Sequence, residues 1–244
     1  MSKLKIELDT HTHTVLSGHA YGTLKENAQA ARDIGLKGFV CADHGPEIPG
    51  AAPAFTLTAV LDGLPDYIED VRLVKGAEAN IMDEGGALDL EMPYIGAAEF
   101  VIASLHTISF PPKDEQANTA AVLGALENPH VDAVGHPGNP KYPLDYKALV
   151  RMSGELGKPV EINNHSFKYR RGSEPNCRRI IRLCREQGVP IIVSSDAHSS
   201  YGVGHFERAL AVLEDEEFPQ ELILNGDFDR FMDYLAARRT RTGN

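Results

Sequence analysis

The stretch KLKIELDTHTH (residues 3–13) decides the fold, because a predicted strand passes directly into two histidines. Residues 3–9 predict a β-strand, and side chains two residues apart on an extended backbone point to the same side, so His11 and His13 project together. The pattern recurs near the far end of the sequence, where a strand predicted at residues 190–195 is followed by Asp196 and His198. Each pair therefore offers two metal-ligating side chains that converge on one point.

Short apolar runs alternate with helical patterns along the chain, which is typical of βα units and a parallel sheet. Seven strands are predicted, at residues 3–9, 37–42, 72–79, 100–105, 132–135, 158–163 and 190–195. Helices are predicted at residues 24–34, 57–69, 117–126, 146–156, 175–187, 205–213 and 228–238. Turn residues at 82–86 predict that residues 87–90 fold back on the third strand as a hairpin.

We expect an α/β fold in which these strands close into a distorted seven-stranded (β/α)7 barrel, similar to a TIM barrel. Closure brings ligands from the first and last strands together, whereas an open sheet would keep them apart. The length of 244 residues suits a single domain that spans residues 1–244.

Composition and charge exclude several classes of function. The formal net charge of -11 argues against an extended nucleic-acid surface, although a pocket that holds several divalent ions can still bind an anion. The three cysteines form no C-x-x-C pair, which fits a reducing compartment. With neither a secretory pattern nor an apolar run of about 20 residues, we expect a cytoplasmic protein without a membrane partner. The basic residues Arg238, Arg239 and Arg241 are expected to form a solvated helix end.

Polar residues that follow the predicted strands supply the candidate metal ligands. These are His11, His13, His19, His44, Glu78, His106, His136, Asp196 and His198. Four ligands complete a structural zinc site and three leave one position open, so nine exceed what one ion needs. We expect two or three divalent ions at the carboxyl ends of the strands, where the active sites of such barrels lie. Imidazole and carboxylate suit Zn²⁺, and Mn²⁺ or Fe²⁺ remain alternatives.

The motifs that carry these ligands resemble the PHP (polymerase and histidinol phosphatase) family, over residues 3 to about 235. The matching segments are DTHTH at 9–13, ADHG at 42–45, GAEAN at 76–80, GHPGNP at 135–140 and SDAH at 195–198, together with His19 and His106. Within the family the chain is most similar to the YcdX-type phosphatases. The resemblance implies a distorted seven-stranded barrel with a three-metal, usually zinc, centre.

The resemblance also sorts the nine candidates into three groups, one for each ion. The groups are His11, His13, Glu78 and Asp196; Glu78, His106 and His136; and His19, His44 and His198. Glu78 thus bridges two ions, and Glu78, Asp196 and His198 are the expected catalytic residues. Asp43 points away from His44 on an extended backbone, so we expect it to orient a ligand imidazole or a neighbouring strand.

These expectations indicate a metal-dependent phosphomonoesterase that attacks a small phosphorylated substrate with a metal-bound hydroxide. In the loop at residues 163–172, Arg170 or Arg171 is expected to bind a phosphate oxygen, with a merely solvated loop as the alternative. Phosphodiester or histidinol-phosphate hydrolysis, which the family also contains, stays open, as does a metal-stabilised, non-catalytic binding module. An amidohydrolase-type deacylase ranks third, because it usually needs eight strands. The sequence leaves the physiological substrate, the native metal and the oligomeric state open.

Overall fold

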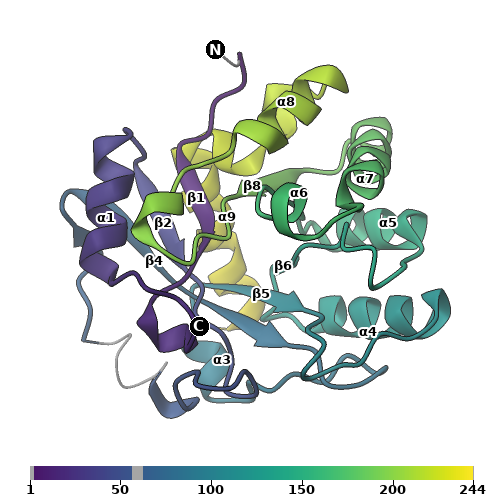
Figure 1. Cartoon of the computed structure of the whole chain (residues 1–244), viewed down its shortest axis with the longest axis horizontal. Helices are drawn as coiled ribbons and strands as arrows, with labels where there is room; N and C mark the ends of the chain where they lie inside the picture. Colours follow the sequence, from purple (N-terminus) through teal and green to yellow (C-terminus); the bar gives the residue numbers. More distant parts are fainter. Residues whose placement is uncertain (1–2, 57–62, 244) are drawn as a thin grey trace.

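The computed structural model describes residues 3–56 and 63–243, and their centre is a curled parallel sheet (Figure 1). Five parallel strands form it, in the order β1 (Leu8–Thr12), β2 (Gly38–Cys41), β4 (Val71–Asn80), β5 (Phe100–Ser104) and β6 (Ala133–Val134). A second parallel sheet consists of β7 (Val160–Asn163) and β8 (Ile191–Ser194). All seven predicted strands are therefore present, although β1 begins at Leu8 and not at residue 3.

Among the described residues, the hydrogen-bonded strand pairs do not form one continuous sheet. A single isolated bridge joins Thr12 of β1 to Ala197, which lies three residues beyond the end of β8. The side chain of Asn225 fills the rest of this junction, because its Nδ2 donates to the carbonyls of Leu8 and Val193 at 2.7 Å each. The α/β class is thus confirmed and the sheet curls into a five-stranded half-barrel, but a complete seven-stranded barrel is not formed by these ladders.

Helices pack around the sheet (Figure 1). They are α1 (Leu24–Asp33), α3 (Tyr94–Ala97), α4 (Glu115–Glu127), α5 (Tyr146–Leu156), α6 (Ser166–Tyr169), α7 (Ser173–Gln187), α8 (Glu207–Asp215) and α9 (Phe228–Thr242), with short 3-10 helices at Val15–Ser17, Ser200–Gly202, Gln220–Leu222 and Leu224–Gly226. Local chemistry sets their ends. Thr23 and Glu26 form a capping box at the start of α1, and Gly157 ends α5 in the left-handed conformation. None of the described helices combines the length and apolar character needed to cross a bilayer.

The helix predicted at residues 57–69 is wrong where the structure can be compared with it. Residues 57–62 lie outside the described residues, and β3 (Tyr67–Ile68) forms a strand antiparallel to β4. The two residues that connect them, Glu69 and Asp70, have φ values of 52° and 64°, as a tight two-residue hairpin requires. Pairing with β4 therefore overrides the helical pattern. The hairpin predicted at residues 87–90 is confirmed, because Ile81 pairs antiparallel with Leu88.

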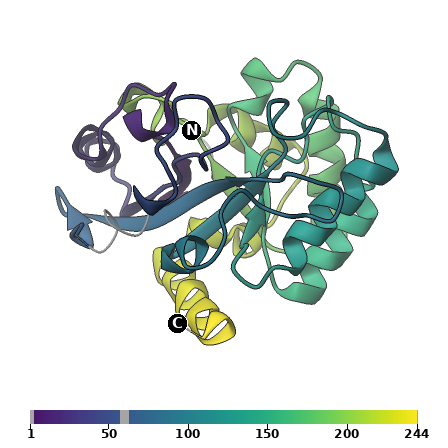
Figure 2. The same ribbon diagram turned by 90° about the horizontal axis from the view of Figure 1, so that it is seen from below.

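The C-terminal helix α9 closes the inner side of the curled sheet and stands apart from the other helices (Figure 2). Phe231 and Leu235 of α9 pack in one buried cluster with Leu8 and Phe100, and the rings of Phe100 and Phe231 lie 5.5 Å apart. Arg238 follows on this helix and is only 1% exposed. The expectation of a solvated basic end is therefore wrong for Arg238, because packing of α9 carries this residue into the protein.

Candidate metal centre

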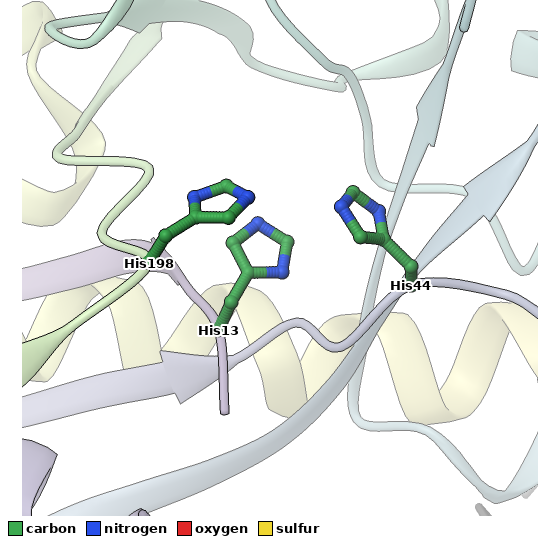
Figure 3. A group of neighbouring side chains, drawn as sticks. All are labelled: His13, His44 and His198. Carbon is green, nitrogen blue, oxygen red and sulfur yellow. The ribbon is translucent and has the colours of Figure 1, made fainter. Parts of the chain in front are cut away.

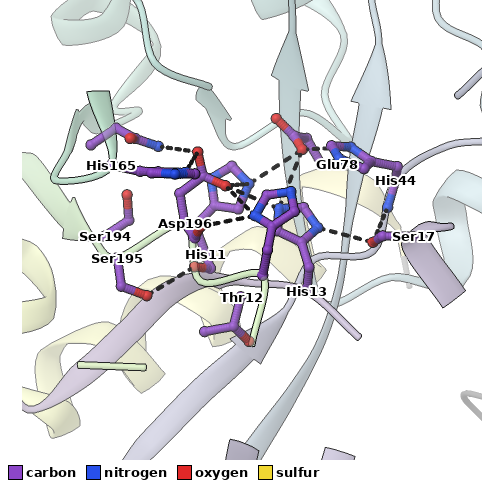
Figure 4. A network of polar contacts seen from close by, with 12 residues as sticks. His11, Thr12, His13, Ser17, His44, Glu78, His165, Ser194, Ser195 and Asp196 are labelled. Carbon is purple, nitrogen blue, oxygen red and sulfur yellow. Dashed lines mark hydrogen bonds and ion pairs between the residues drawn. The ribbon is translucent and has the colours of Figure 1, made fainter. Parts of the chain in front are cut away.

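Five imidazole rings surround the carboxylate of Glu78, which lies on β4 and is 1% exposed. Figure 4 shows three of them, those of His11, His13 and His44. The five rings belong to His11, His13, His44, His106 and His136, and their nearest nitrogens lie 3.3, 3.6, 2.7, 3.5 and 3.2 Å from a carboxylate oxygen. They come from β1 and from the loops after β2, β5 and β6. The carboxyl ends of five strands thus meet at one carboxylate.

Asp196 and His198 complete the cluster, but not by the strand alternation that we expected. β8 ends at Ser194, and Asp196 has a φ of 54°, in the left-handed region that non-glycine residues rarely adopt. This turn brings Asp196 Oδ1 to 3.2 Å from His13 Nε2. Strained backbone of this kind is concentrated at functional sites.

Groups of ligand atoms lie close enough to share an ion. Four groups of three described residues have their ligand atoms within 4.8 Å of one another: His13, His44 and His198; His11, His13 and Glu78; His44, Glu78 and His106; and His165, Asp196 and His198. Figure 3 shows the first group, whose rings reach a common space from three separate segments. His19 and His136 belong to none of these groups, although each lies beside one of them.

The hydrogen bonds of the rings decide which nitrogen carries a lone pair. His19 Nδ1 lies 3.1 Å from the carbonyl of Ser17, and His198 Nδ1 lies 3.0 Å from the carbonyl of Asp196. A carbonyl only accepts, so both Nδ1 atoms donate and both Nε2 atoms of the neutral rings carry lone pairs. These two Nε2 atoms face each other at 3.0 Å. Two lone pairs at this distance repel each other, and either a cation bound between the rings or a proton on one of them relieves the repulsion.

The same argument applies to other rings of the cluster. His106 Nδ1 lies 2.7 Å from Asn80 Oδ1, so Nδ1 donates and Nε2 is left facing Glu78. His13 Nδ1 lies 3.0 Å from the hydroxyl of Ser17, which itself donates to Asp43 at 2.6 Å. Asp43 therefore orients this imidazole through Ser17, in agreement with its expected supporting role.

Several buried atoms of the cluster make no hydrogen bond among the described residues, although the imidazole nitrogens lie 2.7 to 3.6 Å from a Glu78 oxygen. These buried atoms are Nε2 of His11, His13 and His136, Nδ1 of His44, and Oε2 of Glu78. Buried polar atoms without a partner are rare in folded proteins and require an explanation such as an ion. Imidazole nitrogen and carboxylate oxygen are also the donors that divalent zinc prefers. The residues present thus fit a group of divalent ions.

Burial and neighbouring charges shift the pKa values of the ligand groups, in opposite directions for different imidazoles. Burial lowers the pKa of His106 to about 3, against the opposing charge of Glu78, so this ring is neutral. Burial would raise the pKa of Glu78, yet the imidazoles of His11 and His44 hold it well below its usual value. In His11, burial is outweighed by the carboxylates of Glu78 and Glu161, which hold the pKa well above its usual value. The surrounding carboxylates therefore favour a positive charge at His11.

Glu161 is a buried acid of the cluster that sequence analysis missed. It lies on β7, is 1% exposed, and receives His11 Nδ1 and the Ser194 hydroxyl at 2.7 Å each. Its other oxygen accepts the backbone N–H of His136. A signal was present, because one glutamate inside the apolar run Val160–Asn163 is costly to bury unless donors surround it. Glu161 thus links two ligand segments.

Glu161→Gln is expected to lower zinc affinity or kcat/KM by about 10- to 100-fold, the usual cost of losing a group that orients a metal ligand. Donors meet both oxygens of Glu161, so an amide NH₂ in either place would face another donor. Zinc competition with a chromophoric chelator measures the first effect, and steady-state kinetics measures the second. Glu155→Gln, an exposed glutamate on α5, is the matched control, and equal results for both variants would exclude this role.

The structure separates the two arginines that were predicted to bind phosphate. Arg170 Nη1 donates to Asp196 Oδ2 at 3.2 Å and to Ser166 Oγ at 3.1 Å, so its guanidinium lies beside the cluster. Arg171 is exposed, and none of its contacts reaches a ligand candidate among the described residues. His165, which is not among the nine candidate ligands, lies with Nδ1 3.4 Å from Asp196 Oδ2. Its place in the cluster depends on α6, which begins directly after it.

A curled α/β sheet with this ligand set at the carboxyl ends of its strands defines an enzyme with a metal-binding active site. The chain is 44% identical over 238 residues to a "probable phosphatase" of Acetivibrio thermocellus, covering 98% of each chain. It is 46% identical over 242 residues to a "probable phosphatase" of Thermoanaerobacter sp. strain X514, again covering 98% of each. The chain therefore belongs to the family of these probable phosphatases, and the protein is a phosphatase.

Solved structures support the same fold. A histidinol phosphate phosphatase from Lactococcus lactis, in complex with zinc, L-histidinol and phosphate, superposes with a TM-score of 0.61 at 16% identity, over 87% of this chain and 94% of that chain. At this identity the likeness shows the fold alone. No model of a known protein family matches the chain.

Proposed function

We propose that the protein is a metal-dependent phosphomonoesterase of the PHP family, of the YcdX type, that acts on a small phosphorylated molecule. The observation that carries this proposal is the convergence of unpartnered imidazole and carboxylate atoms on Glu78, beside an arginine. In this proposal residues 1–244 form one domain, and the curled sheet with its separate pair is a distorted seven-stranded barrel. The native ions are three, with zinc as the first candidate and Mn²⁺ or Fe²⁺ as alternatives.

Three groups of residues would hold the ions. The groups are His11, His13, Glu78 and Asp196; Glu78, His106 and His136; and His19, His44 and His198. The contact of 3.0 Å between the Nε2 atoms of His19 and His198 supports the third group. The position of Glu78, with Oε2 toward His11 and Oε1 toward His136, supports its role as a bridge. His165 is available beside Asp196 as a further ligand or substrate contact.

Bound divalent ions would supply positive charge to the phosphoryl oxygens and make a water molecule acidic enough to act as a hydroxide nucleophile near neutral pH. The protein's own groups would do the rest. Glu78 and Asp196 are buried anions that keep the positive charges close together, and His198 holds its ring through the Asp196 carbonyl. Arg170 would donate to a non-bridging phosphoryl oxygen, because guanidinium N–H groups match phosphate geometry. No covalent enzyme intermediate is required.

A second candidate substrate is histidinol phosphate, because the Lactococcus lactis structure of similar fold carries L-histidinol and phosphate. Phosphodiester hydrolysis is a third possibility within the same family. From another class, a metal-stabilised binding module would hold ions without turnover. A substrate panel separates these alternatives.

The test is hydrolysis of p-nitrophenyl phosphate by gently purified protein, before and after treatment with a chelator. We expect two to three divalent ions per chain by elemental analysis, loss of hydrolysis to background on chelation, and recovery on adding zinc. Bis-p-nitrophenyl phosphate and histidinol phosphate are assayed in parallel. Chelator-resistant hydrolysis would contradict the metal-dependent mechanism, and folded, metal-loaded protein without turnover would support the binding module.

A further inference from the structure

A hollow opens beside the metal centre between the loop after β6 and the loop that contains α6. Its volume is about 370 Å³, within the range of small-ligand sites, and His106 and His136 form part of its wall. Three basic residues, Lys141, Arg170 and Arg171, also line it. No Asp or Glu is among its lining residues in the part of the chain that the structure describes. The hollow thus joins the ligand cluster to a wall that carries basic and no acidic side chains.

This basic wall is unusual for the protein, in which 35 acidic residues exceed 24 Lys and Arg. Elsewhere arginines pair with acids, as Arg182 does with Glu216 at 2.6 Å. Lys141 and Arg171 are exposed, and no carboxylate of the described residues lies within 4.0 Å of their charged groups. Two unneutralised cations beside a concave site attract anions, even when the whole protein is acidic.

The two loops hold these cations in place. Asn176 Nδ2 donates to the carbonyl of Gly138 at 3.1 Å, which ties α7 to the loop after β6. Gly172 has a φ of 93°, and a Cβ built on it would lie 3.5 Å from Pro140 Cγ. Arg171 directly precedes Gly172, and Lys141 directly follows Pro140. The two contacts therefore bring both basic residues to the same hollow.

The three basic residues do not have the same surroundings. Arg170 is fixed against Asp196 and Ser166, at the place where the scissile phosphate would meet the ions. Lys141 and Arg171 make no such contact with the cluster, so a substrate with one phosphate bound at the ions leaves them without an anionic partner. A second anion on the substrate would meet them.

We propose that Lys141 and Arg171 form a subsite for a second anionic group, so that the preferred substrate is a small phosphomonoester that also carries a carboxylate or a second phosphate. This inference rests on the proposed phosphomonoesterase function and names its substrate class. A leaving group with a positive charge, such as histidinol, would be repelled by the same wall. The subsite therefore also separates this protein from a histidinol-phosphate phosphatase.

Matched substrate pairs test the subsite. 3-Phosphoglycerate and glycerol 3-phosphate differ by a carboxylate in place of a hydroxymethyl group, and fructose 1,6-bisphosphate and fructose 6-phosphate differ by a phosphate. For the metal-loaded wild type, we expect kcat/KM to favour the doubly anionic member of at least one pair by about tenfold or more. The pair that shows the preference identifies the second anion as carboxylate or phosphate.

The double variant Lys141→Ala/Arg171→Ala is expected to lower this preference ratio about tenfold. Lys147→Ala, an exposed lysine on α5 outside the hollow, removes one charge without touching the subsite and should keep the ratio. The subsite is overturned if the wild type has a kcat/KM ratio near one for both pairs, or if the double variant loses kcat/KM equally on both members of a pair. Hydrolysis of these esters would still support the phosphomonoesterase function. Absence of hydrolysis of every ester by metal-loaded protein overturns both proposals.

Discussion

Glu78→Gln is expected to lower kcat/KM on phosphomonoesters by about 10³-fold or more and to reduce the number of bound ions. The substitution keeps the volume of the side chain but removes the negative charge that five imidazoles surround at 2.7 to 3.6 Å. A bridging carboxylate offsets the repulsion between two cations about 3.5 to 4 Å apart, and an amide does not. A loss of about 4 kcal/mol in transition-state stabilisation corresponds to the stated change in rate.

Steady-state kinetics and elemental analysis on the same preparations measure both effects. Circular dichroism establishes that the variant is folded, because Glu78 also receives the Ser104 hydroxyl at 2.5 Å and supports β5. Glu127→Gln, an exposed glutamate at the end of α4, changes the net charge equally and should behave as wild type. Near-full activity and metal content in Glu78→Gln would remove this residue from the centre.

Arg238→Ala is expected to lower the free energy of unfolding by about 3 to 5 kcal/mol, the usual cost of removing one partner of a buried ion pair. Arg238 Nε lies 2.7 Å from Asp132 Oδ2, and its two Nη atoms donate to the carbonyls of Ala98 and His130 at 2.9 and 2.8 Å. The substitution would leave the Asp132 carboxylate buried without this charge. For a chain of this size the melting temperature should fall by roughly 10 °C.

Thermal and denaturant unfolding of the metal-loaded protein test this expectation. Arg239→Ala is the neighbouring control, because Arg239 is 61% exposed and its ion pair with Glu99 should contribute less than about 1 kcal/mol. Equal melting temperatures for the two variants would show that α9 is not held by Arg238. If Arg238 acts only in this anchor, kcat/KM per folded molecule at low temperature should match that of the wild type.

The strands could be located from the sequence because each is a short apolar run bounded by turn residues. The helix at Tyr146–Leu156 coincides with its predicted range for the same reason, since Asp145 caps its start and Gly157 ends it. The predicted helix at residues 57–69 failed because β3 gains its hydrogen bonds from β4, and a partner strand leaves no mark in the local pattern. Turn and capping residues thus predicted where strands and helices begin and end, but the pairing of β3 with β4 was missed.

The ligand candidates could also be found from the sequence, because each lies near or beyond the carboxyl end of a predicted strand and carries a donor atom. Their convergence depends on the tertiary structure. The left-handed turn at Asp196, the contact of Glu161 with both His11 and His136, and the split between Arg170 and Arg171 all depend on where separate loops meet. None of these has a periodic signal.

The sequence by itself determined the α/β class, the positions of the strands along the chain and the set of donor side chains. The reason is that backbone geometry and residue chemistry act over a few neighbouring residues. Only the tertiary structure decided which donors face one another and which remain without a partner. It also decided that Arg238 is buried while Arg239 is exposed, and that Lys141 and Arg171 border one hollow. The physical reason is that charge, burial and hydrogen bonding depend on distances between residues far apart in the chain, which packing alone sets.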